Sequence, residues 1–155
     1  MAPLVAPFVG ERYAEQRRLG EFIAPPYDVI GSDERERLAS RDAHNVVHLI
    51  LPAGEADRYD GAAHLLAEWR AAGVLVADDK ASVTVLRQEF SSPGGDRLVR
   101  TGVIGGVAAE PFSTGRVKPH ERTHTGPKED RLALLRSTEA MFEALFMVAR
   151  DPDGS

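Results

Sequence analysis

Residues 82–109, SVTVLRQEFSSPGGDRLVRTGVIGGVAA, decide the class of fold. The segments SVTVLRQEF and LVRTGVIGGVAA are rich in β-branched residues, and the first alternates between apolar and polar positions, which predicts paired strands. Between them lies SSPGGDR, whose proline and adjacent glycines are typical of a turn. The stretch therefore predicts one β-hairpin. Glycines inside the second strand indicate a bulge or a close backbone contact at Gly102, Gly105 and Gly106.

Helical patterns flank this hairpin on both sides. Residues 57–72 place apolar side chains at helical spacing, and Gly73 supplies a C-terminal stop. We expect Trp69 on this helix to belong to the core. Shorter helices are predicted from Ser32 or Asp33 to about Ser40 and from Lys128 to about Ala140.

Three further segments complete the predicted fold. A short helix is expected at 11–19, a buried strand at 45–51 (NVVHLIL, closed by Pro52) and a last strand at 143–149 (EALFMVA). Strands and helices then alternate irregularly. This order favours an α/β domain, with α+β as the alternative, in which two to four helices pack on a mixed β-sheet.

Bulk composition limits the classes of function. The chain has 155 residues, 43% of them hydrophobic and 28% charged, which suits one globular domain over 1–155. A net charge of -5 argues against broad nucleic-acid binding, and the lack of cysteine excludes disulfides and a thiolate zinc site. No apolar run approaches the ~18 residues of a membrane span, and no signal peptide is evident, so we expect a cytoplasmic protein with no membrane partner.

The stretch KPHERTHTGPKEDR (118–131) carries the clearest candidate for chemistry. Its residues His120-Glu121-Arg122-Thr123-His124 match the H-E-x-x-H pattern of zinc proteases. That pattern needs a helix to bring both histidines to one metal ion. Here prolines at 119 and 127 leave too little room for such a helix. We therefore expect no zinc site in this stretch.

The same stretch is rich in cationic side chains and leads into a predicted helix. Unpaired N–H groups and the helix dipole make such a terminus attractive to phosphate or carboxylate. Arginine adds a planar fork that can hold phosphate through two bonds. The candidate anion ligands in this stretch are Lys118, His120, Arg122, Thr123, Lys128 and Arg131. Glu121 and Asp28 are the candidates for proton transfer or for holding Mg²⁺.

A plain solvated loop is the alternative to an anion site. Glu129 and Asp130 fall in the first turn of the predicted helix, where they can satisfy the same dipole without any ligand. Against this, the predicted loop 110–127 is long, and long connections in compact domains are usually functional. Both interpretations remain open from the residues alone.

Several blocks of the chain resemble a known family. IAPPYDVI (23–30), NVVHLILP (45–52), LRQEF (86–90), RTGVIGGV (100–107) and KPHERTHTGPKEDRLALLRST (118–138) are similar to successive blocks of the bacterial and archaeal domain-of-unknown-function family numbered 1015. The matching positions that concern the site are Pro26, Tyr27, Asp28, His120, Glu121, Arg122, Thr123, Lys128, Asp130 and Arg131. At His124 the family commonly carries an apolar residue, which makes the zinc pattern accidental.

The resemblance implies a kinase-like role. Family members continue beyond the part similar to this chain, and that continuation carries a segment similar to the phosphate-binding element of free-serine kinases. We therefore expect the N-terminal, phosphate-binding module of a longer phosphotransferase, inactive alone, which acts on a small hydroxylated metabolite with ATP or ADP and Mg²⁺. Tyr27 joins the expected phosphate-binding residues. The alternative is a non-catalytic binding or interaction module, whose partner is the C-terminal half or a second copy.

Overall fold

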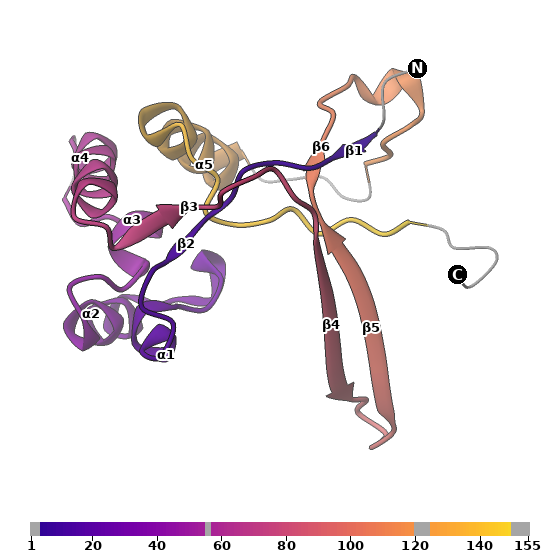
Figure 1. Cartoon of the computed structure of the whole chain (residues 1–155), viewed down its shortest axis with the longest axis horizontal. Helices are drawn as coiled ribbons and strands as arrows, with labels where there is room; N and C mark the ends of the chain where they lie inside the picture. The colour runs from indigo at the N-terminus through magenta and orange to yellow at the C-terminus, as the bar shows by residue number, and fades with distance from the viewer. Residues whose placement is uncertain (1–3, 55–56, 120–124, 150–155) are drawn as a thin grey trace. The chain divides into compact units, whose positions relative to one another are not determined.

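The computed structural model describes residues 4–54, 57–119 and 125–149, and its elements are labelled in Figure 1. It has the predicted α/β character. The helices are α1 (Leu19–Phe22), α2 (Ser32–Arg41), α3 (Val47–Ile50), α4 (Arg58–Ala71) and α5 (Thr125–Thr138), with short 3-10 helices η1 (Tyr27–Val29) and η2 (Phe112–Thr114). The strands are β1 (Val5–Ala6), β2 (Glu11–Tyr13), β3 (Leu75–Ala77), β4 (Thr84–Ser91), β5 (Arg97–Ile104) and β6 (Gly106–Val107).

The chain divides into two compact units. Unit 1 contains residues 1–17 and 68–128, and unit 2 contains residues 18–67 and 129–155. Helices α4 and α5 each contribute residues to both units. Each unit is described by itself below. The expectation that 1–155 forms one domain stays a prediction.

Unit 1 holds all the strands of the described residues. They pair as three separate two-stranded antiparallel ladders, β1 with β6, β2 with β3 and β4 with β5. The predicted hairpin is confirmed, because Thr84 pairs with Ile104 and Ser91 with Arg97. Gly105, which follows β5, makes the predicted close contact: a Cβ there would lie 2.8 Å from Val5 Cγ1.

Helix α4 forms as its periodicity predicts. It spans Arg58–Ala71, and Gly73 follows it with a φ of 71°, the left-handed conformation that glycine adopts without strain. Trp69 is only 3% exposed and lies against Tyr13, with ring centroids 6.1 Å apart. The prediction that Trp69 is a core residue is confirmed.

Unit 2 is helical and has its own apolar centre. Its buried apolar side chains are Phe22, Leu38, Val47, Leu49, Ile50, Ala62, Leu66 and Leu134. Helix α2 confirms the predicted charged helix. Fully buried Asn45 connects two segments of this unit, since its Nδ2 donates to the carbonyls of Glu21 (2.7 Å) and Ile23 (3.2 Å) while its Oδ1 accepts from Val47 N–H (3.0 Å).

The predicted strand at 45–51 is wrong, because Val47–Ile50 form helix α3. The Asn45 side chain binds the first N–H of α3, and Val46 N–H donates to the Phe22 carbonyl at 2.6 Å. These bonds start a helical turn. Short apolar runs can form either element, because periodicity does not separate a buried strand from a buried helix.

Two other predictions are also wrong. Residues 11–13 form strand β2 rather than a helix, and α1 begins only at Leu19. Residues 143–149 form no strand, and Leu145, Phe146 and Val148 are exposed. An apolar run becomes a strand only when another strand pairs with it, and none in the described part of the chain pairs with this one.

Candidate functional site

The extended segment before η1 forms one side of the candidate site in unit 2. Pro26 has the backbone angles φ -53° and ψ 142°, and the helical turn begins at the next residue, Tyr27. Proline favours this start because its ring fixes φ. The Tyr27 backbone N–H donates to Glu143 Oε1 at 2.9 Å, which connects η1 to the segment that follows α5.

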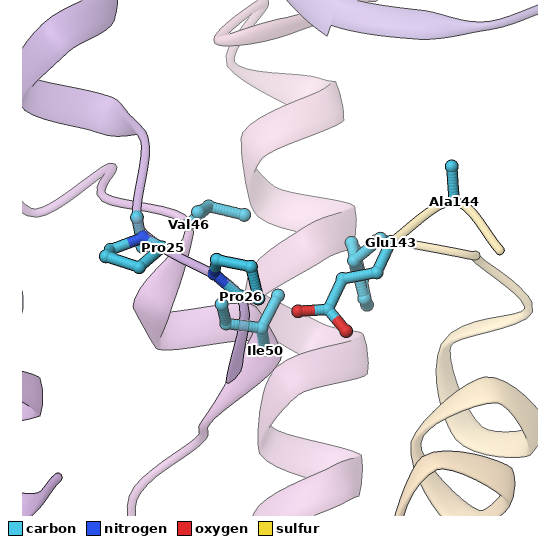
Figure 2. Close-up of a pocket in the computed structure, with 8 residues that line it drawn as sticks. Pro25, Pro26, Val46, Ile50, Glu143 and Ala144 are labelled. Carbon is cyan, nitrogen blue, oxygen red and sulfur yellow. The ribbon is translucent and has the colours of Figure 1, made fainter. Parts of the chain in front are cut away.

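A pocket of about 340 Å³ lies between these segments (Figure 2). Its walls are formed by Ala24, Pro25, Pro26, Val46, Ile50, Phe142, Glu143 and Ala144. Figure 2 shows the Glu143 carboxylate directed toward Pro26. Glu143 is the one ionisable residue among the eight that line the pocket. The pocket therefore combines apolar walls with a single hydrogen-bond acceptor group of negative charge.

Arg131 contacts one residue of the pocket wall and is not itself among the residues that line it. Its Nη1 donates to the carbonyl of Ile50, a pocket residue, at 2.8 Å. Its guanidinium carbon lies 4.1 Å from the centre of the Tyr27 ring, a cation–π contact. Arg131 is thereby held in one place by groups from two other segments of unit 2.

Asp130 connects Arg131 to helix α4. Its Oδ2 accepts from Arg131 Nε at 2.8 Å and also contacts Arg131 Nη2. Its Oδ1 accepts from Tyr59 Oη at 2.6 Å and from Arg58 Nη2 at 2.9 Å. The four side chains Arg58, Tyr59, Asp130 and Arg131 are called the Asp130 cluster below.

The Asp130 cluster keeps its carboxylate charged. Partial burial by itself raises the pKa of Asp130. Hydrogen bonds from Tyr59 and Arg131, together with the positive charges of Arg131 and Arg58, lower it by more. The pKa of Asp130 consequently lies below its ordinary value. One carboxylate thus faces two guanidinium groups, which leaves an excess of positive charge within the cluster.

Two of the predicted site residues are brought together by unit 2. Tyr27 and Arg131 are in contact, while Asp28 is exposed on η1. Lys118 and Lys128 are exposed residues of unit 1. The predictions for His120, Glu121, Arg122 and Thr123, and for His124 in the zinc pattern, fall outside the described residues.

Sequence reasoning missed the other half of this arrangement. Arg58 and Tyr59 lie 72 and 71 positions from Asp130, and no local pattern connects them. Glu143 was placed in a strand and not in a pocket. Within the Asp130 cluster, Asp130 and Arg131 carried a sequence signal: both belong to a block that resembles the family, and Arg131 is also one of the cations of the stretch 118–131.

Within 4–54, 57–119 and 125–149, no group of three or more His, Asp or Glu side chains is placed to hold a metal ion. None of the helices in those ranges has the length and apolar character needed to cross a membrane.

The fold and the pocket define an α/β protein with a small-molecule-sized cavity beside an arginine–carboxylate cluster. The chain belongs to a family described as a protein of unknown function (DUF1015), whose model matches residues 5–155. Comparison with curated proteins gave no match. Comparison with solved structures gave none either.

Proposed function

We propose that this chain binds a small phosphate-bearing ligand at the edge of the unit 2 pocket, as the ligand-binding module of a kinase-like phosphotransferase. The observation that carries the proposal is the sharing of Asp130 by Arg58 and Arg131. Because one carboxylate balances only one of the two guanidinium groups, an added anion gains from the remaining positive charge.

Arg131 is the residue proposed to hold phosphate. Nε, Nη1 and Nη2 each donate to Asp130 or Ile50 already. The second hydrogen on each Nη atom has no partner among the residues that the structure describes, so both can bind ligand oxygens. The Tyr27 ring and the Ile50 carbonyl fix the plane of the guanidinium, which reduces the entropy that binding must overcome.

The pocket is proposed to hold the uncharged part of the ligand. Its volume of about 340 Å³ suits a small metabolite, and its walls are mostly apolar. Glu143 Oε1 accepts from Tyr27 N–H, which leaves Oε2 to accept a hydrogen from a ligand hydroxyl. Phosphoryl transfer depends mainly on positioning and on stabilisation of charge, which a fixed guanidinium and a fixed carboxylate can supply. Asp28 or Glu121 is the residue proposed to orient a substrate hydroxyl or to hold Mg²⁺.

Calorimetric titration of the whole chain tests this proposal. Pyrophosphate, ADP, ATP and a dicarboxylate are titrated with and without Mg²⁺. We expect phosphate-bearing ligands to bind, and Arg131→Ala to weaken binding about tenfold or more, since hydrogen bonds to charged groups contribute roughly 1.5–3 kcal/mol. Arg122→Ala and Lys128→Ala test the basic stretch separately.

Arg136→Ala is the matched control, because Arg136 is an exposed arginine in the last turn of the same helix. It should bind like the unmodified chain. Unchanged affinity in Arg131→Ala, or failure of the unmodified chain to bind any of these anions, would reject an anion site here.

The alternative function is a non-catalytic interaction module. It is favoured by the exposed apolar side chains of hairpin β4–β5, which include Val85, Leu86, Phe90, Leu98 and Val103. Ligand binding and docking of a partner would use different surfaces, since the pocket belongs to unit 2 and the hairpin to unit 1.

A further inference from the structure

Hairpin β4–β5 is exposed along its length. Every residue of β4 is exposed, and in β5 all but Gly102 are. Figure 1 shows the two strands as a ribbon, and no third strand of the described chain pairs with either. A two-stranded hairpin is marginally stable in water, and each free edge presents unpaired N–H and C=O groups to another strand. This ribbon therefore has the properties of an interaction surface.

The charges on β4 make it complementary to itself. Within one chain Glu89 accepts from Arg87 on its own strand and from Arg97 on β5, the latter at 2.7 Å. When two copies of β4 pair antiparallel about Gln88, Arg87 of one copy lies opposite Glu89 of the other, and the reverse pair forms at the same time, so that each Glu89 meets arginines of both copies. On the other face, Leu86 of one copy lies opposite Phe90 of the second. Both are substantially exposed in the single chain, at 41% and 46%. Opposite charges and apolar pairs directly across an antiparallel ladder are both stabilising.

The β5 edge of the hairpin is not complementary to a second copy of itself. Strand β5 carries Arg97 and Arg100 and no acidic residue. Inside the hairpin Arg97 donates to Glu89 and Arg100 donates to Gln88, both on β4. Pairing of two β5 strands would therefore add arginines of the second copy without adding a β5 carboxylate opposite them. Electrostatics therefore selects β4 as the edge that meets a second copy.

We propose that two copies of this chain associate through their β4 strands, in a two-fold arrangement centred on Gln88. The product is a four-stranded antiparallel sheet in the order β5–β4–β4–β5. Such an interface is isologous, because each copy contributes the same strand. It converts two marginal ribbons into a sheet with enough strands to be stable.

Charge-reversal variants test the proposed register. Arg87→Glu places glutamates opposite glutamates, and Glu89→Arg places arginines opposite arginines. We expect each variant alone to raise the dimer dissociation constant about tenfold or more in analytical ultracentrifugation, because two favourable pairs become two unfavourable ones. An equimolar mixture of the two variants should form a heterodimer, since every charge then meets its opposite. Circular dichroism of each variant checks that it is folded.

Cysteine cross-linking gives an independent readout. The chain has no cysteine, so Gln88→Cys introduces a single thiol, which the two-fold arrangement places opposite its own copy. We expect mild oxidation to yield a disulfide-linked dimer. Thr101→Cys is the matched control, because Thr101 pairs with Arg87 inside the hairpin, on the strand that the proposal leaves outside the interface.

Four results would overturn the proposal. The unmodified chain could remain monomeric at all concentrations tested. The dimer could persist equally in Arg87→Glu and Glu89→Arg, or the mixture of these variants could fail to restore it. Equal cross-linking of Gln88→Cys and Thr101→Cys would likewise exclude this register.

Discussion

Replacement of Asp130 by asparagine tests whether one carboxylate connects helices α4 and α5 in unit 2. Asparagine has nearly the same shape but no charge. One carbonyl oxygen remains to accept from Tyr59 and Arg58, whereas the amide hydrogens would face the donors of Arg131. The variant therefore removes the charge-assisted interactions of Asp130 with Arg58 and with Arg131 without opening a cavity.

The expected loss of stability follows from the exposure of these groups. The Asp130 and Arg131 side chains are 28% and 23% exposed, so their interaction is only partly screened by water. The Arg58 side chain is 39% exposed, and its pair with Asp130 is closer to a surface ion pair, of about 0.2–1 kcal/mol. A charge-assisted bond in a more buried place contributes about 1.5–3 kcal/mol. We expect a total loss of about 2 kcal/mol in the free energy of unfolding, and a Tm lower by about 4–8 °C.

The stability lost in Asp130→Asn should become smaller as the pH falls. The pKa of Asp130 in the folded chain is lower than its ordinary value of 3.8, because the hydrogen bonds and charges of its partners outweigh partial burial. Its contribution to stability is therefore complete above the ordinary value and disappears as the pH falls through the folded-state pKa. The difference between the unmodified chain and Asp130→Asn should be constant near neutral pH and should shrink in acid.

Urea unfolding followed by circular dichroism measures both effects. Glu129→Gln is the control, because it removes one exposed carboxylate from the neighbouring position of the same helix. A difference below about 0.5 kcal/mol between Asp130→Asn and this control at neutral pH would refute the reasoning. So would a difference that grows as the pH is lowered.

Three other substitutions probe the two units. Asn45→Ala should lower the free energy of unfolding by about 2–4 kcal/mol in urea titrations, because it leaves buried backbone groups without their partners. Trp69→Ala should lower the free energy of unfolding by about 3–5 kcal/mol in the same titrations, because Trp69 is only 3% exposed and its removal leaves a cavity. Gly105→Ala should lower the Tm in a thermal melt by placing a Cβ 2.8 Å from Val5 Cγ1, whereas Gly102→Ala, which has open space, should have a much smaller effect.

The site could be predicted only in part. The cationic stretch before the predicted helix selects Arg131, the resemblance to the family selects Tyr27, and the structure places the two residues in contact. Their meeting could not be derived from the chain, because it depends on how η1 packs beside α5. The Asp130 cluster could not be predicted either, because it depends on how α4 packs beside α5. The sequence describes the helix that carries Arg58 and Tyr59 only by its apolar spacing.

The local sequence pattern alone determined the elements whose backbone hydrogen bonds are formed within the element itself. Helix α4 needs only its apolar spacing and Gly73, and hairpin β4–β5 needs only alternation around a proline–glycine turn. Tertiary structure decided the segments that need distant partners. Val47–Ile50 became a helix because Asn45 and the Phe22 carbonyl hold its start, and residues 143–149 did not become a strand because no described strand pairs with them. A short apolar run is compatible with either element, and the contacts around it choose between them.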